Sequence, residues 1–388
     1  MTVIGLLAKI FIKENGSPEK VRGSYGKLCS FVGICLNILL FGIKLFAGII
    51  SGAISVISDA FNNLTDATSS LIALLGFKLS EQKADKDHPF GHGRFEYISG
   101  FIVSMLIILV GFELGKTSIE KIITPEAVEF SYVAVIILVV SIAIKAYMAF
   151  YNFRISKKIS SAAMRATATD SLSDCIATTA VLASLIIAKV FSVNIDAYCG
   201  LAVSGFILFS GLRSAKETID PLLGGSPSKE YINEITTIVY SYEGVKGIPD
   251  LIVHDYGPGR AMISLHAEVD AKADLLQTHD MIDNIESELR EKLKCDAVIH
   301  MDPIVTDDPI INELREKITS LVTCIDAGIT IHDFRMVVGP THTNVIFDVA
   351  VPFGVKKSDD EIRESVQTIV RTLDGNYFAV INIDKAYS

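Results

Sequence analysis

The sequence of 388 residues lacks paired cysteines, a basic soluble region and recognisable catalytic motifs. Its six cysteines show no C-x-x-C spacing, so neither a zinc finger nor a disulfide scaffold is expected. Residues 221–388 carry 15 Lys and Arg against 28 Asp and Glu, which argues against a nucleic-acid partner. Because no nucleophile-base pair, nucleotide motif or redox pair is found, an enzyme is not expected either.

Half of the residues are hydrophobic, and long apolar stretches recur up to about residue 216 and then stop. Six of them are long enough to cross a bilayer, at about 29–50, 54–79, 97–117, 131–152, 162–188 and 195–216. The sequence therefore predicts an α-helical membrane protein with six transmembrane helices in residues 25–217. Residues 1–24 are expected to form a cytoplasmic N-terminal segment without a cleavable signal.

Lys and Arg are concentrated in the N-terminal segment and in the loops after the second and fourth spans. The alternate loops are poorer in basic residues. Short loops rich in Lys and Arg stay on the cytoplasmic side. The pattern therefore predicts that the N- and C-termini are both cytoplasmic.

The soluble tail contains two blocks with the same pattern, at 249–302 and 332–384. Each reads as strand, Gly-Pro turn, strand, helix and strand, and a further helical segment precedes each block. We therefore predict a cytoplasmic α+β domain of ferredoxin-like αββαβ type at 221–305 and a second, similar domain at 306–388, duplicated in tandem. The alternative is chance similarity between two small α+β domains.

Polar pairs interrupt two of the apolar stretches: Asn62 with Asp66, and Asp170 with Asp174. A spacing of four residues places both members of a pair on one helix face. Carboxylates inside a membrane normally face a partner or a water-filled path. The two faces together predict a site for a divalent cation. The alternative is a structural salt bridge with Lys44 or Lys145, which are the basic residues well within the spans.

All eight histidines lie outside the predicted spans, so the membrane site has no imidazole ligand. Carboxylate and amide oxygens suit magnesium, calcium and manganese, whereas zinc favours His and Cys. The ligand types therefore favour a hard cation. Asp59 lies one turn before Asn62 on nearly the same face, which suggests the ion path or the surroundings of the ligands.

Two further groups outside the spans contain metal-ligand residue types. The loop DHPFGHGRFE carries His88 and His92 four residues apart, with Asp85 just before it, and could bind zinc or manganese. A polar loop that caps the third span is the alternative. In the tail, the spacing alone does not show whether the candidate ligands converge; they are His254, His266, His279 and His300, with Asp255 and Asp302.

The six spans, the DHPFGHGRFE loop, both polar pairs and the tail domain ending in HMDP together resemble the cation diffusion facilitator family of divalent-metal exporters. The resemblance covers about residues 25–303. It implies a homodimer, a metallochaperone-like cytoplasmic domain, and metal export against inward proton movement by alternating access. It also implies a loop metal site on Asp85, His88 and His92, and an inter-subunit charge interlock on Arg94 and Asp220. The family's metal cluster in the cytoplasmic domain is partly matched: its early histidine falls on Pro249, and the residues close to the other expected places are His266, His279, His300 and Asp302.

The set Asn62, Asp66, Asp170 and Asp174 departs from the zinc-transporting pattern of this family at its first and third positions, and it resembles that of bacterial manganese exporters. We therefore expect a manganese exporter of a bacterial inner or plasma membrane that works by proton antiport and uses no cofactor. Its expected partners are the metal ion, protons, membrane lipid and a second copy of the chain. The alternatives are a broader iron, cobalt or zinc exporter, and a membrane metal sensor that acts through its acidic tail.

Overall fold

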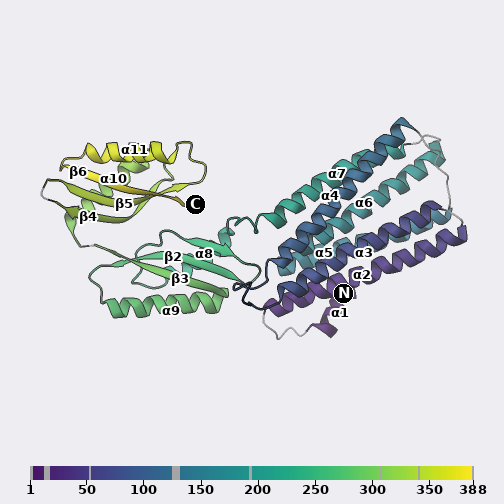
Figure 1. Ribbon diagram of the computed structural model, residues 1–388, viewed down its shortest axis with the longest axis horizontal. Helices are drawn as coiled ribbons and strands as arrows, with labels where there is room; N and C mark the ends of the chain where they lie inside the picture. Colours follow the sequence, from purple (N-terminus) through teal and green to yellow (C-terminus); the bar gives the residue numbers. More distant parts are fainter. Residues whose placement is uncertain are drawn as a thin grey trace. The chain divides into compact units, whose positions relative to one another are not determined.

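The computed structural model of the protein describes residues 3–12, 18–51, 54–124, 132–191, 195–305, 307–339 and 341–386. The chain divides into two compact parts. The helical unit comprises Met1–Gly225 with Tyr256–Pro258, and the α+β unit comprises Ser226–Asp255 with Gly259–Ser388 (Figure 1).

A short helix and six long helices build the helical unit: α1 (Val3–Phe11), α2 (Pro18–Ser51), α3 (Ile54–Ser80), α4 (Phe95–Ile123), α5 (Tyr132–Ile159), α6 (Ala162–Phe191) and α7 (Asp196–Ile219). Among the described residues, α2, α4, α5, α6 and α7 are long and apolar enough to cross a membrane. The polar helix α3 is not among these five, so a sixth span stays a prediction. Several helices begin earlier or end later than the predicted spans, because hydropathy marks only their apolar part.

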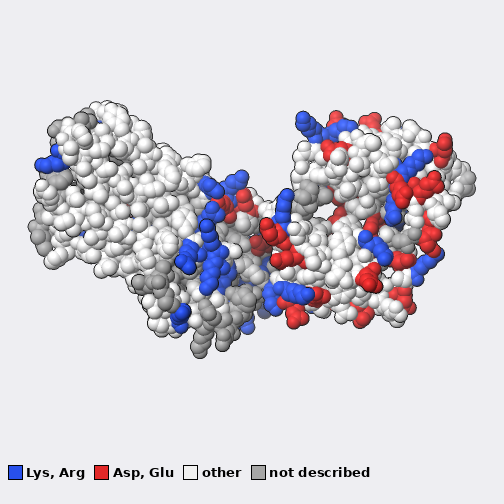
Figure 2. Space-filling model, turned by 180° about the vertical axis from the view of Figure 1, so that it is seen from behind, with Lys and Arg blue, Asp and Glu red and all other residues white. Residues whose placement is uncertain are grey.

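Large apolar side chains on the long helices point outward, as expected for a surface that faces lipid; Phe46, Phe112 and Phe209 are examples, each more than 60% exposed. On the face shown in Figure 2, the helical unit has few charged side chains except at one end, where Lys and Arg gather. Inside, close helix packing depends on small residues. A side chain at Gly100 of α4 would come within 2.9 Å of the Ala163 backbone in α6.

The α+β unit contains two subdomains with the same element order. The first subdomain is α8 (Lys229–Tyr240), β1 (Ile252–Asp255), β2 (Ala261–Asp270), α9 (Leu275–Leu293) and β3 (Cys295–Ile304). The second subdomain is α10 (Pro309–Thr323), β4 (Thr330–Val338), β5 (Thr343–Pro352), α11 (Asp359–Arg371) and β6 (Tyr377–Ala386). In each sheet the first strand is antiparallel and the third parallel to the middle strand. An origin by duplication stays a prediction.

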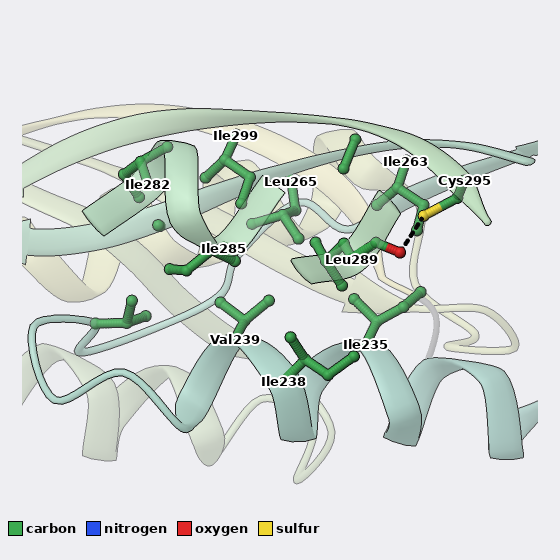
Figure 3. Close-up of a cluster of buried hydrophobic side chains, with 13 residues drawn as sticks. Ile235, Ile238, Val239, Ile263, Leu265, Ile282, Ile285, Leu289, Cys295 and Ile299 are labelled. Carbon is green, nitrogen blue, oxygen red and sulfur yellow. Dashed lines mark hydrogen bonds between the residues drawn. The ribbon is translucent and has the colours of Figure 1, made fainter. Parts of the chain in front are cut away.

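Each subdomain has its own apolar core between its two helices and its sheet. In the first core, Ile235 from α8 and Ile285 and Leu289 from α9 pack against Leu265 of β2 (Figure 3). The thiol of Cys295 donates a hydrogen bond to the Leu289 carbonyl at 3.5 Å and is buried in this core. This cysteine is therefore a small core residue and not a ligand.

Candidate metal sites

Three aspartates from two helices meet around one lysine inside the helical unit. The Lys145 ammonium of α5 lies 2.7 Å from a carboxylate oxygen of Asp66 on α3 and 2.7 Å from one of Asp174 on α6. Asp170, one turn before Asp174, interacts electrostatically with both aspartates and with Lys145. The Lys145 side chain is only 4% exposed, whereas those of Asp66 and Asp174 are 20% and 23% exposed.

This arrangement contains elements of both interpretations of the sequence. Lys145 forms the salt bridge that was the alternative to a metal site, yet one ammonium cannot neutralise three carboxylates. Lys44 of α2 also interacts with Asp66 electrostatically, but more weakly than Lys145 does. The direct contacts of Lys145 therefore balance one of the three negative charges. One divalent cation would balance the other two.

The other polar residues of α3 are distributed differently. Asn62 is exposed one turn from Asp66, and no described hydrogen bond or ion pair joins it to the three aspartates. Asn63 is buried, at 2% exposure. The side chain of Asp59 lies outside the part of the chain that the structure describes. The structure therefore brings together three of the four predicted ligands.

The loop between α3 and α4 brings Asp85, His88 and His92 together, with one ligand atom from each within 4.8 Å of the others. The Asp85 carboxylate lies 3.4 Å from Nδ1 of His88 and 3.5 Å from Nε2 of His92. Nδ1 of His92 lies 3.1 Å from the Lys83 carbonyl, and a proton donated there would leave Nε2 free as a ligand.

Local backbone geometry explains this loop. Asp85 accepts hydrogen bonds from the backbone N–H groups of His88 and Asp87, at 2.7 and 3.0 Å. The bond from His88 is the main cause that holds the pKa of the Asp85 carboxyl below its ordinary value. Gly91 adopts a φ of 80°, which favours glycine and turns the chain between the two histidines. Asp85 is thus charged and oriented at neutral pH.

In the first subdomain, three of the four predicted tail ligands lie close together. His266 Nδ1 is 2.8 Å from Asp302 Oδ2, and His300 Nε2 is 3.4 Å from Asp302 Oδ1. His279 lies on α9 and is exposed beside Asp283 at 3.4 Å. No described contact joins His279 to the other three.

A second cluster in the α+β unit was not predicted from the sequence. It contains Asp250, His332 and Asp348, whose ligand atoms also lie within 4.8 Å of one another. The tail alignment could have indicated it, since Asp348 falls at the position of His266 in the repeated pattern. Only Asp250 comes from the first subdomain, and spacing alone does not show that the two subdomains meet there.

A buried ion pair that was not predicted from the sequence connects three parts of the helical unit. The Glu96 carboxylate on α4 is fully buried and accepts two hydrogen bonds from the Arg22 guanidinium of α2 and one from the Ser161 hydroxyl, at 2.5 Å. Arg22 also donates to the Ile159 carbonyl at 2.7 Å. The pair thus joins α2, α4 and the α5–α6 turn. Asp220 follows α7 directly, and its predicted interlock with Arg94 of a second subunit stays a prediction.

Most of the chain is similar to known proteins. Residues 30–223 match the model of the cation efflux transmembrane domain, and residues 227–304 match that of the cytoplasmic domain of cation efflux proteins. An uncharacterized transporter of Methanocaldococcus jannaschii is 30% identical over 71% of this chain and 96% of its own length. The cation-efflux pump FieF is 30% identical in Klebsiella pneumoniae and 31% identical in Escherichia coli, over 72% of this chain and 94% of each pump.

These matches include both the helical unit and the first subdomain, and they do not extend to the second subdomain. They confirm the predicted family and an integral membrane transporter in place of an enzyme. The chain belongs to the cation diffusion facilitator family of divalent-cation efflux transporters.

Proposed function

We propose that the protein exports manganese from the cytoplasm through the site formed by Asp66, Asp170 and Asp174. The observation that carries this proposal is a cluster of three carboxylates, to which no described histidine or cysteine adds an imidazole or thiolate ligand. Oxygen ligands suit manganese better than zinc. Asn62, exposed one turn from Asp66, is the proposed fourth ligand, and Asp59 is proposed to lie on the ion path.

Lys145 gives this site a cation of its own when no metal is bound. Its ammonium donates to Asp66 and Asp174, so an incoming ion must displace it from at least one carboxylate. With Lys145 charged, three carboxylates leave two negative charges, and one Mn²⁺ balances them. We propose that two protons balance the same charges on the return step, which makes the transporter an antiporter.

The architecture proposed for this activity has six transmembrane helices with both termini in the cytoplasm. Because the aspartates lie on α3 and α6, a tilt of these two helices against the others would change the side from which the site is open. The match of residues 227–304 to the family's cytoplasmic domain supports a homodimer. Such a dimer would lie in a bacterial inner or plasma membrane.

A broader exporter of iron, cobalt or zinc is the second candidate. The loop cluster Asp85, His88 and His92 supports it, because two imidazoles and a carboxylate suit zinc and its neighbours. We propose that this loop binds a metal ion, and that His266, His300 and Asp302 bind another in the first subdomain, with His279 as a further candidate. A sensor without transport is not supported, because both matched domains belong to efflux proteins.

Flux into proteoliposomes tests the proposed function. Manganese and zinc uptake are measured for the native chain, for Asp66→Ala, and for the control Glu113→Ala, which removes an exposed carboxylate from α4. We expect manganese flux to be lost in Asp66→Ala and retained in the control. Unchanged flux in Asp66→Ala would remove the proposed site. Equal manganese and zinc flux in the native chain would remove the manganese selectivity.

A further inference from the structure

Four side chains face one another where the first subdomain contacts the second. Asp250 precedes β1, His332 lies on β4, Asp348 on β5 and Asp384 on β6. His332 Nε2 is 3.6 Å from an oxygen of Asp250 and 3.9 Å from one of Asp384. The subdomains also meet beside this cluster, since the Asp333 N–H donates to the Glu268 carboxylate at 3.3 Å.

The separations within this cluster suit metal ligands better than hydrogen bonds. At 3.6 and 3.9 Å, the contacts of His332 are too long for hydrogen bonds to carboxylates. Two atoms bound at about 2.1 Å to one ion in tetrahedral geometry lie roughly 3.4 Å apart. Asp348 also offers an oxygen within 4.8 Å of the ligand atoms of Asp250 and His332. A small inward shift would bring these atoms to one ion.

Burial and charge favour the binding of a cation at the same place. The His332 side chain is 11% exposed, and both ring nitrogens are buried without a hydrogen-bond partner in the described chain. Among the described ion pairs, none joins Lys or Arg to Asp250, Asp348 or Asp384. Burial is the main cause that raises the pKa of the Asp250 and Asp348 carboxyls, and nearby carboxylates raise both further while His332 lowers them.

The two sheets explain why ligands recur here. His266 is the sixth residue of β2 and Asp348 the sixth of β5, whereas Asp302 is the eighth of β3 and Asp384 the eighth of β6. In both sheets the middle strand is parallel to the last one, in the same register. The second subdomain therefore has carboxylates at the places where the first has His266 and Asp302. Asp250 lies between the clusters, with its second oxygen 3.9 Å from His266.

We propose that Asp250, His332, Asp348 and Asp384 bind one divalent cation that joins the two subdomains. One imidazole and three carboxylates suit Mn²⁺ or Zn²⁺, whereas Mg²⁺ prefers oxygen ligands and water. The site is separate from the transport site and does not depend on which ion is exported. Bound metal would tie the subdomains together, because Asp250 comes from the first and the other ligands from the second.

Metal stoichiometry of the full-length protein in detergent tests this site. Mn²⁺ and Zn²⁺ bound per chain are measured by equilibrium dialysis and elemental analysis for the native chain, His332→Ala, Asp348→Asn and the control His342→Ala. His342 is an exposed histidine of the same subdomain, in the turn before β5. We expect both site variants to lose one ion per chain, or to bind it at least about 10- to 100-fold more weakly, and the control to match the native chain.

Native stoichiometry and affinity in both site variants would overturn the proposal. Circular dichroism and size-exclusion chromatography check that each variant folds. Asp348→Asn keeps the size of the side chain, so it decides the question if His332→Ala does not fold. Flux through the membrane site is measured separately, so a failure here is distinguishable from a failure of the proposed transport.

Discussion

Replacing Lys145 by Met removes the cation that holds the membrane site together when no metal is bound. In the native chain the ammonium donates to Asp66 and Asp174 at 2.7 Å each and is 4% exposed. Without it, these two carboxylates and Asp170 face one another, and only the weaker electrostatic interaction of Lys44 with Asp66 is left among the described lysines. Breaking a buried ion pair on one side costs about 3–5 kcal/mol, so we expect metal-free Lys145→Met to be less stable by about that amount.

Manganese should reverse much of this loss, because a divalent ion supplies the missing positive charge without competing against the ammonium. At about 100 times its dissociation constant a ligand stabilises the folded state by about 2.7 kcal/mol. The measurement is thermal unfolding in detergent, with chelator and with Mn²⁺, together with Mn²⁺ affinity. We expect a larger stabilisation by Mn²⁺ and tighter binding in Lys145→Met than in the native chain. Lys145→Arg keeps the charge and is the control.

Two outcomes would refute this reasoning. If Lys145→Met is as stable as the native chain in chelator and binds Mn²⁺ equally well, the ammonium does not neutralise the site. If the folded variant loses Mn²⁺ binding, Lys145 supports the bound metal and does not compete with it.

Two further predictions concern the metal selectivity and the buried ion pair between Arg22 and Glu96. Asp170→His adds an imidazole to the site and should increase zinc flux relative to manganese flux in proteoliposomes; an unchanged ratio would mean that cavity geometry sets the selectivity. Glu96→Gln should destabilise the protein by about 3 kcal/mol in thermal unfolding, because it leaves the Arg22 guanidinium without its buried partner. The control Glu81→Gln breaks the exposed pair with Lys27 and should cost less than about 1 kcal/mol, so equal losses would contradict the argument.

The helical period and the loop motif predicted most of the candidate site. Asp170 and Asp174 lie four residues apart on one helix, and the structure places both near Asp66, as the argument from helix faces requires. That argument could not show which carboxylates contact Lys145. Hydropathy indicates that a helix is long and apolar enough to span the membrane, but it does not indicate which face of the helix packs against its neighbours. The argument from helix faces also joined Asn62 to Asp66 by spacing alone, whereas the Asn62 side chain is exposed.

The α-β-β-α-β element order was predictable because strands and helices have different periods and the Gly-Pro turns separate them. The cluster around His332 was not predictable from the sequence, because its proposed ligands come from two subdomains. His332 also lies next to a β-bulge, where Asp333 adopts a φ of 50° and the register with β5 shifts. A bulge re-aims the neighbouring side chains, and no period in the sequence reports where it falls.

The proposed transport site and the cluster around His332 differ in the positive charge that is present when no metal ion is bound. In the proposed transport site, the Lys145 ammonium contacts Asp66 and Asp174, so it would compete with the metal and limit the affinity. An ion that must be released on the other side needs such a limit. Among the described ion pairs, none joins Lys or Arg to the cluster around His332, so only protons would compete there with a cation. We therefore expect the cytoplasmic cluster to retain its ion at free metal concentrations that leave the membrane site empty.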